Sequence, residues 1–340
     1  MNTTTIGIDI AKSVFQVSMA NRAGRIVDRK RLSRTQFQRF LAEQPNAALV
    51  MEACATSHHW ARTAQSHGHR TRLLHAQYVR PYVRRNKTDA ADADALLRAS
   101  RDPDLKGVVV KSLDQQALQG LHRIRSQWQD TRRQRICLVR GLLAEFGISL
   151  ATGTSGLAAR LRSVSDRLPP LLATAIDPVI EEIVDLETKI KQIDRQLTEL
   201  AKQSPIGRCL LSIPGVGVIT ATALISSVGD IHAFNRARQF SAWLGLTPRE
   251  YSSGQSRHLG GISKRGDRYL RMLLIHGARS ALLMAHRQAT KGEHTLTELQ
   301  RWVLRLECRA NHNKATVALA NKMARIIWSV WTTEEEYQPR

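Results

Sequence analysis

One carboxylate inside an apolar strand constrains this chain more than any other feature of its sequence. Residues 4–15 read TTIGIDIAKSVF, and β-branched residues there flank Gly7 and Asp9. The pattern predicts a short buried strand, followed by a hairpin around residues 11–13. Burying a carboxylate without a partner is costly. Asp9 therefore either hydrogen-bonds the adjacent turn or binds a metal ion, and the rest of the chain has to distinguish the two.

The charge of the chain indicates a polyanionic partner. Its 340 residues include 51 Lys and Arg against 29 Asp and Glu, a formal net charge of +22. The chain is 42% hydrophobic and can therefore bury real cores. Such an excess of positive charge on a globular chain favours nucleic acid as the partner. A basic protein with no such partner is the alternative. The length predicts two or three domains.

The sequence also indicates where the protein works. No apolar run approaches the roughly 20 residues that cross a bilayer, and the polar N-terminal segment has no signal-peptide pattern. Four cysteines are scattered along the chain without a C-x-x-C pair. This usage suits a reducing compartment and argues against a disulfide framework. We therefore expect a cytoplasmic protein that is associated with the nucleoid when it is bound to DNA.

Strands and helices alternate in the first predicted domain, residues 1–110, which indicates an α/β sheet. Strands are expected at 25–32, 47–51 and 71–75, and helices at 35–44 and 60–66. Glu52 follows the apolar run AALVM. Open α/β sheets bind their ligands at the ends of such strands. Glu52 is thus the same kind of residue as Asp9, in the same kind of place.

A third group of acids lies in a predicted helix that begins at Thr88 or Asp89. Asp89 and Asp92 are three residues apart and share one helical face, whereas Asp94 points elsewhere. Like charges on one face repel, and a bound cation would remove that cost. The alternative is that acids in a first turn simply suit the helix dipole.

Together these residues predict a metal site. Asp9, Glu52, Asp89 and Asp92 offer only oxygen ligands, which select Mg²⁺ or Mn²⁺. Two such ions can clamp the attacking and leaving oxygens of a phosphodiester. Just before the helix, basic side chains interleave with Tyr78 and Tyr82, a pattern that suits a nucleic-acid backbone and an unstacked base. The alternative is a solvated charged face. The basic candidates nearest the helix are Arg84, Arg85 and Lys87.

The middle segment, residues 111–203, is predicted to be helical. One long helix is expected over 113–146, and a second begins with Asp177 as its cap and Pro178 at its first position. From residue 179 onward apolar residues step by 4 and 3 through about three heptads. This seam indicates either a helical hairpin within the chain or a contact in self-association, which we favour. Its members are Val179, Ile183, Leu186, Ile190, Ile193, Leu197 and Leu200.

The last predicted domain, residues 204–332, opens with a helix-hairpin-helix pattern. Residues 206–228 contain an I-P-G-V-G turn between two apolar helical stretches. Gly215 and Gly217 allow the turn to approach a phosphate, toward which the second helix directs free N–H groups. The alternative is a tight turn packed in a core.

A long loop follows a helix predicted over 236–244. Residues 245–266 are rich in Gly and Ser, and long ordered loops of this kind are often functional. Ser252 and Ser253 precede Gly254, although a serine in such a loop is most often a turn residue. Helices at 267–286, 293–309 and 314–331 are expected to hold the loop. The basic residues in and beside it are Arg249, Arg257, Lys264, Arg265 and Arg268.

Nearly the whole chain resembles the DEDD transposases of insertion sequences, which are related to Piv-type DNA invertases and bridge-RNA-guided recombinases. The resemblance depends on motifs in both terminal domains. They are G-I-D-I-A-K at 7–12, M-E-A at 51–53, N-K-T-D-A-A-D-A at 86–93, and then I-P-G-V-G, G-L-T-P-R, S-S-G and I-S-K-R-G-D-R-Y-L-R at 262–271.

The resemblance implies an RNase H-like (RuvC-like) N-terminal domain, a coiled-coil middle and a helical transposase domain. It makes Asp9, Glu52, Asp89 and Asp92 catalytic metal ligands, and it makes a serine of the C-terminal domain the nucleophile that becomes joined to DNA. We expect this to be Ser253, with Ser252 as the second choice.

The resemblance also implies a non-coding bridge RNA, donor and target DNA, and assembly as a dimer of dimers. Two other functions stay open. One is a RuvC-like metal-dependent nuclease that uses water and forms no covalent intermediate. The other is an architectural DNA-binding protein built on the helix-hairpin-helix.

Overall fold

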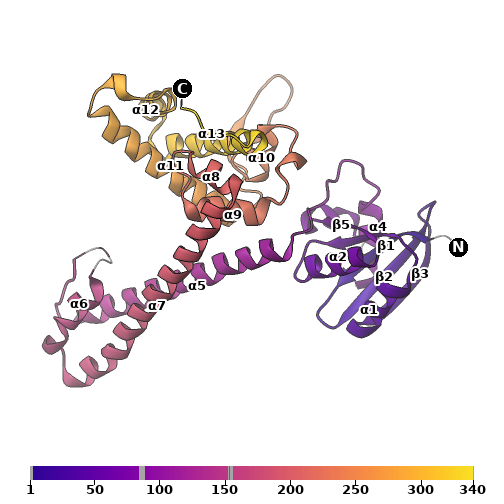
Figure 1. Ribbon diagram of the computed structural model, residues 1–340, viewed down its shortest axis with the longest axis horizontal. Coiled ribbons are helices and arrows are strands. Elements are labelled where there is room, and N and C mark those ends of the chain that lie inside the picture. The colour runs from indigo at the N-terminus through magenta and orange to yellow at the C-terminus, as the bar shows by residue number, and fades with distance from the viewer. Residues whose placement is uncertain (1–2, 84–88, 152, 154–155, 340) are drawn as a thin grey trace. The chain divides into compact units, whose positions relative to one another are not determined.

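The computed structural model describes residues 3–83, 89–151, 153 and 156–339, and it divides into two compact units. The first unit spans Met1–Ser112 and the second Leu113–Arg340 (Figure 1). The first combines a sheet with helices, and the second is mainly helical. The chain therefore has the mixed α/β and helical fold class expected from its sequence.

The first unit is built on one five-stranded sheet of order β3-β2-β1-β4-β5. The central strand β1 pairs antiparallel with β2 and parallel with β4, and β4 pairs parallel with β5. The strands predicted from apolar runs are thus confirmed, together with the turn between Ile10 and Val14. Their bounds are β1 Thr3–Ile10, β2 Val14–Asn21, β3 Ile26–Ser33, β4 Ala48–Glu52 and β5 Arg70–Leu74.

Helices cover both faces of this sheet. On one face, α1 (Arg34–Glu43) and α2 (Ser57–Ser66) bury a core in which Phe15 stacks on Phe37 with ring centroids 4.5 Å apart. On the other face lies α4 (Asp89–Ala99), with short turns at α3 (Ala76–Val79) and η1 (Arg80–Tyr82) before it. Because strand side chains alternate between faces, each face has its own core.

Gly7 sets how closely α4 approaches the sheet. A methyl group at this position of β1 would clash with the carbonyl oxygen of Ala93 and lie 2.9 Å from the Leu97 side chain. Only glycine leaves that space open, so the helix backbone rests directly on the strand. The residue two places further along β1 is Asp9.

Two long helices form the first part of the second unit. They are α5 (Leu113–Glu145) and α7 (Pro170–Gln203), joined through α6 (Leu157–Arg162) and η2 (Ser165–Arg167). The predicted start of the second helix at Asp177 is wrong, since Pro178 lies inside α7. A proline inside a helix removes one hydrogen bond. The buried Ile176 and Ile180 on either side of it pack into a core with α5 and α6, which offsets that cost.

The heptad seam of α7 lies against α5 of the same chain. Ile183, Leu186 and Ile190 are buried along it. Ion pairs flank the seam, with Arg135 Nε 2.6 Å from Glu182 Oε2 and Arg132 Nη1 3.5 Å from Glu187 Oε1. Of the two alternatives, the seam thus forms the helical hairpin within the chain. The self-association that we favoured for it stays a prediction, and another surface would have to carry it.

The remaining helices bury one large core. The helix-hairpin-helix pattern becomes α8 and α9, and the three C-terminal helices appear close to their predicted bounds. The loop predicted over 245–266 differs, because it forms an antiparallel hairpin of β6 and β7. The elements are α8 Pro205–Leu211, α9 Val218–Val228, η3 Ile231–Ala233, α10 Ala237–Trp243, β6 Pro248–Glu250, β7 Leu259–Ile262, α11 Arg268–Ala289, η4 Glu293–Thr295, α12 Glu298–Ala310 and α13 His312–Thr333.

The described helices and the cysteines agree with what the sequence predicts for membrane spans and disulfides. No helix among the described residues is both long and apolar enough to span a bilayer. Cys54, Cys137, Cys209 and Cys308 are all free thiols. The division of the second unit at residue 203 stays a prediction.

Candidate active site

Asp9 and Glu52 lie near the carboxyl ends of two neighbouring parallel strands, Asp9 as the last residue but one of β1 and Glu52 as the last residue of β4. Ile8 of β1 is the partner of Met51 of β4, and Asp9 and Glu52 are the next residue of each strand. Adjacent strands lie about 4.8 Å apart. Ile8 and Met51 are fully buried on the face of α1 and α2, so the two carboxylates point to the face that α4 covers.

The thiol of Cys54 reports the same convergence. Burial raises the pKa of Cys54, and the negative charges of Glu52 and then Asp9 raise it further. The Cys54 amide also donates to the Glu52 carbonyl oxygen over 2.8 Å. Both carboxylates thus lie close enough to the Cys54 thiol to influence its charge.

The third predicted ligand lies on α4 above this face. Asp92 is half-buried and directly precedes Ala93, whose carbonyl oxygen faces Gly7. Asp89 is the first residue of α4, but its side chain is outside the described residues. In the part of the chain that is described, no three His, Cys, Asp or Glu form a group that could hold a metal ion. The four-carboxylate site therefore stays a prediction.

Asp94, the extra acid of the same helix, has a structural role. Its carboxylate accepts hydrogen bonds from Ser18 Oγ at 2.7 Å and from Arg29 Nη2 at 2.8 Å. Gly7, Ser18 and Arg29 form one row across three strands, so the side chain of Asp94 fastens α4 to that row. The sequence predicted that Asp94 lies on a different side of the helix from Asp92, and on that side Asp94 contacts Ser18 and Arg29.

Replacing Asp94 is expected to affect stability. In an Asp94→Ala variant the buried hydroxyl of Ser18 loses its acceptor and Arg29 loses its ion pair. We expect the free energy of unfolding in urea to fall by about 1–3 kcal/mol. The matched control is Asp92→Ala on the same helix, which should lower it much less. Equal losses in the two variants would contradict this assignment.

The same network predicts a pH dependence. Burial disfavours the charged form of Asp94, but hydrogen bonds from Arg29 and Ser18 outweigh it and hold its pKa below the ordinary 3.8. A carboxyl whose pKa is depressed on folding stabilises the protein above its unfolded pKa and loses this effect as pH falls through the folded value. The stability difference between wild type and Asp94→Ala should therefore shrink below about pH 4. A constant difference down to lower pH would contradict it.

Ser253 lies at the tip of the β6–β7 hairpin. Ser253 and Ser256 exchange two backbone hydrogen bonds of 3.1 Å each, and Gly254 between them takes a φ of +55°. A glycine at the first central position is typical of a type II′ hairpin turn. Within the described residues the Ser253 hydroxyl has no hydrogen-bond partner, and it is exposed.

The neighbouring hydroxyls are engaged. Ser252 Oγ donates to Glu250 Oε1 over 2.7 Å, and Ser256 Oγ lies 3.0 Å from His258 Nε2. The Ser252 hydrogen bond, followed by the positive charge of Arg257, lowers the pKa of Glu250. Sequence reasoning missed both pairs. Each pair joins residues two apart, at the end of β6 or in the connection between β6 and β7, a region predicted from the sequence to be a loop.

Close backbone contacts hold the base of the hairpin. A side chain on Gly245 would clash with the backbone of Arg265, and one on Gly266 with the carbonyl of Trp243. Lys264 takes a φ of +56°, unusual for a residue with a side chain, and its amide donates to the Gly245 carbonyl oxygen over 3.1 Å. Residues of the G-L-T-P-R and S-K-R-G motifs thus pack against each other at the base of the hairpin that carries Ser253.

The basic candidates differ in their surroundings. Arg84, Arg85 and Lys87 lie outside the described residues. In the second unit, Arg257 Nε lies 3.3 Å from Glu250 Oε1, and Arg249 Nη2 donates weakly to the Ser263 carbonyl oxygen. The other three basic candidates are exposed: Lys264, Arg265 and Arg268.

The two glycines of the I-P-G-V-G turn also differ. Gly215 takes a φ of +86°, and a Cβ there would crowd the carbonyl oxygen of Gly277 in α11. Packing against α11 therefore accounts for Gly215. This is the alternative considered from the sequence, a tight turn packed in a core. Gly217 is exposed, has open space around its Cα and precedes the first turn of α9. It stays a candidate for a phosphate contact.

His122 is a buried polar residue that the sequence did not single out. His122 of α5 lies between Tyr269 Oη and Thr222 Oγ1, at 3.1 Å from each, in a position where the pattern favoured Leu121 and Ile124. Burial, with the positive charge of Arg125, lowers the pKa of His122 to about 4. A neutral histidine with both nitrogens engaged is a core residue that joins α5 to α9 and α11.

Comparison with protein families gives two matches. The chain matches a DEDD transposase family over residues 6–148 and the "Transposase IS116/IS110/IS902 family" over residues 207–293. The first match contains Asp9, Glu52, Asp89 and Asp92, and the second contains Ser252 and Ser253.

Individual relatives agree with these matches. The chain is 41% identical over its full length to a Pseudomonas aeruginosa protein described as "Probable family 20 transposase", all of which is covered. It is 38% identical to the "Transposase for insertion sequence element IS1111A" of Coxiella burnetii, over 98% of the chain and 91% of that protein. A "Pilin gene-inverting protein" of Moraxella bovis is 26% identical over the full chain and 99% of its own length.

Proposed function

This chain belongs to the IS116/IS110/IS902 family of insertion-sequence transposases, and on that premise we propose that it cuts and rejoins DNA through a covalent link to Ser253, with divalent-metal assistance. As a DNA transposase it is an enzyme with DNA as its partner. The observation that carries the metal half of the proposal is that Asp9 and Glu52 directly follow the paired residues Ile8 and Met51 of neighbouring strands, on the sheet face that α4 covers.

The donor set fits a hard divalent cation. The candidate ligands are all carboxylates, and two of them act together on the Cys54 thiol. Asp9, Glu52, Asp89 and Asp92 would hold the cation. Magnesium or manganese bound there would supply positive charge that stabilises a phosphate under attack. The strand order β3-β2-β1-β4-β5 with helices on both faces supports an RNase H-like form for this unit.

Ser253 is the group that attacks in this proposal. Its oxygen forms a bond to phosphorus while the bond from phosphorus to one DNA oxygen breaks. The serine proton leaves to solvent or a base, and the departing DNA oxygen gains a proton to become a free hydroxyl. The reverse attack by a DNA hydroxyl reseals the strand and frees the serine, so no bond energy is lost and no ATP is required.

The surroundings of the two serines favour Ser253 over Ser252. Ser253 is exposed at a hairpin tip, where a DNA strand can reach it, and its hydroxyl makes no hydrogen bond to any described residue. The Ser252 hydroxyl is held by Glu250. Nearby Arg249, Arg257, Lys264, Arg265 and Arg268 would stabilise phosphate charge.

Guidance by a bridge RNA encoded in the same element, and assembly as a dimer of dimers, complete the proposal. A net charge of +22 suits a protein that holds both RNA and DNA. Binding of this kind should weaken steeply as salt rises.

A denaturing gel tests the central step. Purified protein, labelled DNA from the ends of its own element and Mg²⁺ should give a DNA band that migrates with the protein in SDS. Free DNA ends without such a band would instead support hydrolysis by water on the acidic site. DNA binding without any breakage would support the architectural alternative.

A further inference from the structure

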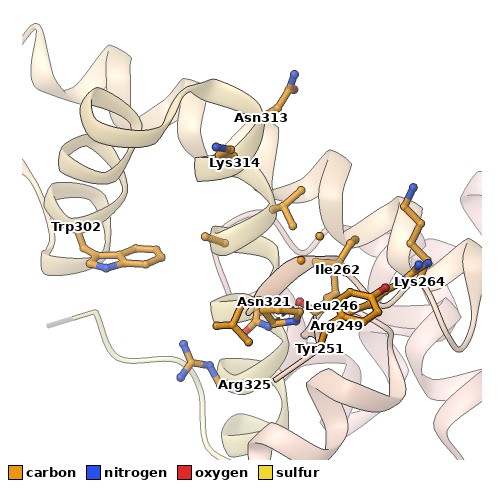
Figure 2. A pocket seen from close by; sticks show the side chains of 16 residues that line it. Leu246, Arg249, Tyr251, Ile262, Lys264, Trp302, Asn313, Lys314, Asn321 and Arg325 are labelled. Carbon is orange, nitrogen blue, oxygen red and sulfur yellow. Dashed lines mark hydrogen bonds between the residues drawn. The ribbon is translucent and has the colours of Figure 1, made fainter. Parts of the chain in front are cut away.

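A large groove lies beside the serine hairpin in the second unit. Figure 2 shows its walls, with Trp302 of α12 on one side, Tyr251 and Arg249 of the hairpin on the other, and α13 between them. The cavity has a volume of about 1070 Å³. That is at the upper limit of ordinary small-molecule sites, which hold about 300–1,000 Å³, so it has room for a segment of a polymer.

The charge of the groove has one sign. Four of its sixteen lining residues are cationic, namely Arg249, Lys264, Lys314 and Arg325, and none of the sixteen is acidic. The Nε of Arg325 is shielded from solvent and has no hydrogen-bond partner among the described residues. A groove lined by cations and by no acid attracts anions. The four cations are spread along it rather than gathered at one point, which suits an extended polyanion (Figure 2).

Two aromatic side chains face the groove from opposite walls. Tyr251 follows β6 and is 63% exposed, with its ring beside Gly260 of β7. Trp302 is half-buried, and the Lys322 ammonium lies 4.3 Å from its ring centroid. Aromatic faces interleaved with cations bind the bases and phosphates of an unpaired strand, since paired bases present no free face for stacking.

The floor between these walls is firmly held. Asn321 of α13 donates its side-chain amide to the Leu246 carbonyl oxygen over 2.9 Å, and Val317 and Ala318 line the helix surface beside it. The groove is thus formed within one unit by elements that are fixed to each other, and its hairpin wall is the one that carries Ser253.

We propose that this groove binds an unpaired stretch of nucleic acid next to the strand that Ser253 attacks, with bases on Tyr251 and Trp302 and phosphates on Lys314 and Arg325. The inference rests on the proposed function, because it takes DNA or RNA as the polyanion. An unpaired strand has the same chemistry whether it is displaced DNA or a loop of RNA.

Fluorescence anisotropy of the full chain with labelled short oligomers tests this directly. The probes are oligothymidylate, oligouridylate and a DNA duplex of equal length. Tyr251→Ala should weaken binding of the single strands about tenfold, with Tyr251→Phe close to wild type, because the ring and not the hydroxyl stacks. Binding of the duplex should be unaffected by Tyr251→Ala. A preference for oligothymidylate would assign the groove to DNA, and a preference for oligouridylate to RNA.

The cations have their own readout. Each phosphate contact contributes about 0.7 to the slope of log affinity against log salt for single strands, so Lys314→Ala combined with Arg325→Ala should reduce that slope by about 1.4. Arg287→Ala, which removes an exposed cation of α11 outside the groove, should leave affinity and slope unchanged. Melting temperatures of all variants should be compared, and Lys314→Ala alone, at an exposed position, reports if the double variant is unstable.

Three results would overturn the proposal. The first is single-strand affinity that is unchanged in folded Tyr251→Ala and Lys314→Ala variants. The second is a loss of duplex affinity in Tyr251→Ala equal to the loss of single-strand affinity, and the third is displacement of the oligomers by an acidic peptide at a similar concentration. Ser253→Ala separates this inference from the proposed function, since it should keep full oligomer affinity. Loss of the covalent adduct with intact groove binding would fault neither, whereas an adduct that persists in Ser253→Ala would fault the proposed function alone.

Discussion

A Ser253→Ala variant should bind element DNA as tightly as wild type yet form no SDS-stable protein–DNA adduct. The substitution removes one exposed hydroxyl from a hairpin tip whose backbone hydrogen bonds to Ser256 do not involve it. The fold should therefore be unaffected, while the group that bonds to phosphorus is gone. Removal of a catalytic nucleophile lowers rates by about a thousandfold or more, so recombination should fall below detection.

The neighbouring serines provide matched controls on the same hairpin. Ser252→Ala removes the hydroxyl that Glu250 holds at 2.7 Å, and Ser256→Ala removes the partner of His258. Both variants should still form the adduct, at a reduced rate if those pairs help to shape the tip. An adduct that is retained in Ser253→Ala but lost in Ser252→Ala would identify Ser252, whose hydroxyl donates to Glu250, as the nucleophile.

The second large effect is expected for Asp9→Asn. The change keeps the size of the side chain and removes its charge, at the strand end where Asp9 and Glu52 are neighbours. A cation held by carboxylates should then bind much more weakly, and strand cleavage should fall by about a thousandfold or more. Cleavage and adduct formation should be measured across a magnesium titration, together with DNA binding in the absence of metal.

Asp9→Asn also discriminates between kinds of activity. DNA binding without metal should be the same as in wild type, because the metal site acts on the reaction. Glu52→Gln should give the same loss, since it is the partner across the two strands. Normal recombination in Asp9→Asn would remove the metal site from the mechanism, and a loss of DNA binding alone would point to an architectural role.

Local sequence patterns were sufficient to predict most strands of the first unit. The apolar runs that predicted β1 and β4 also placed Asp9 within the first strand and Glu52 at the end of the second, and the parallel pairing of the two strands brings them into the same register. Nothing local could assign Asp94, however. Its partners Ser18 and Arg29 lie 76 and 65 residues away, so its role depends on which strands pair, and the sequence did not specify the order β3-β2-β1.

The errors in the second unit have separate physical causes. The cap-and-proline rule placed a helix start at Asp177, but the apolar contacts of Ile176 and Ile180 outweigh the hydrogen bond that Pro178 forfeits. The β6–β7 hairpin could not be predicted because its short strands contain Pro248, Gly260 and Gly261, residue types that are depleted in strands. Its strands form nonetheless, because Gly245 and Gly266 allow backbone contacts with Arg265 and Trp243 that no propensity scale includes.

The glycine at position 7 has a consequence for the proposed metal site. Because Gly7 leaves room for the backbone of α4 at Ala93, the clearance between that helix and β1 depends on a residue that has no side chain. A Gly7→Ala variant should therefore push α4, which carries Asp92, away from β1, which carries Asp9. If the proposed carboxylates share a cation, this one methyl group would weaken its binding without altering any of them.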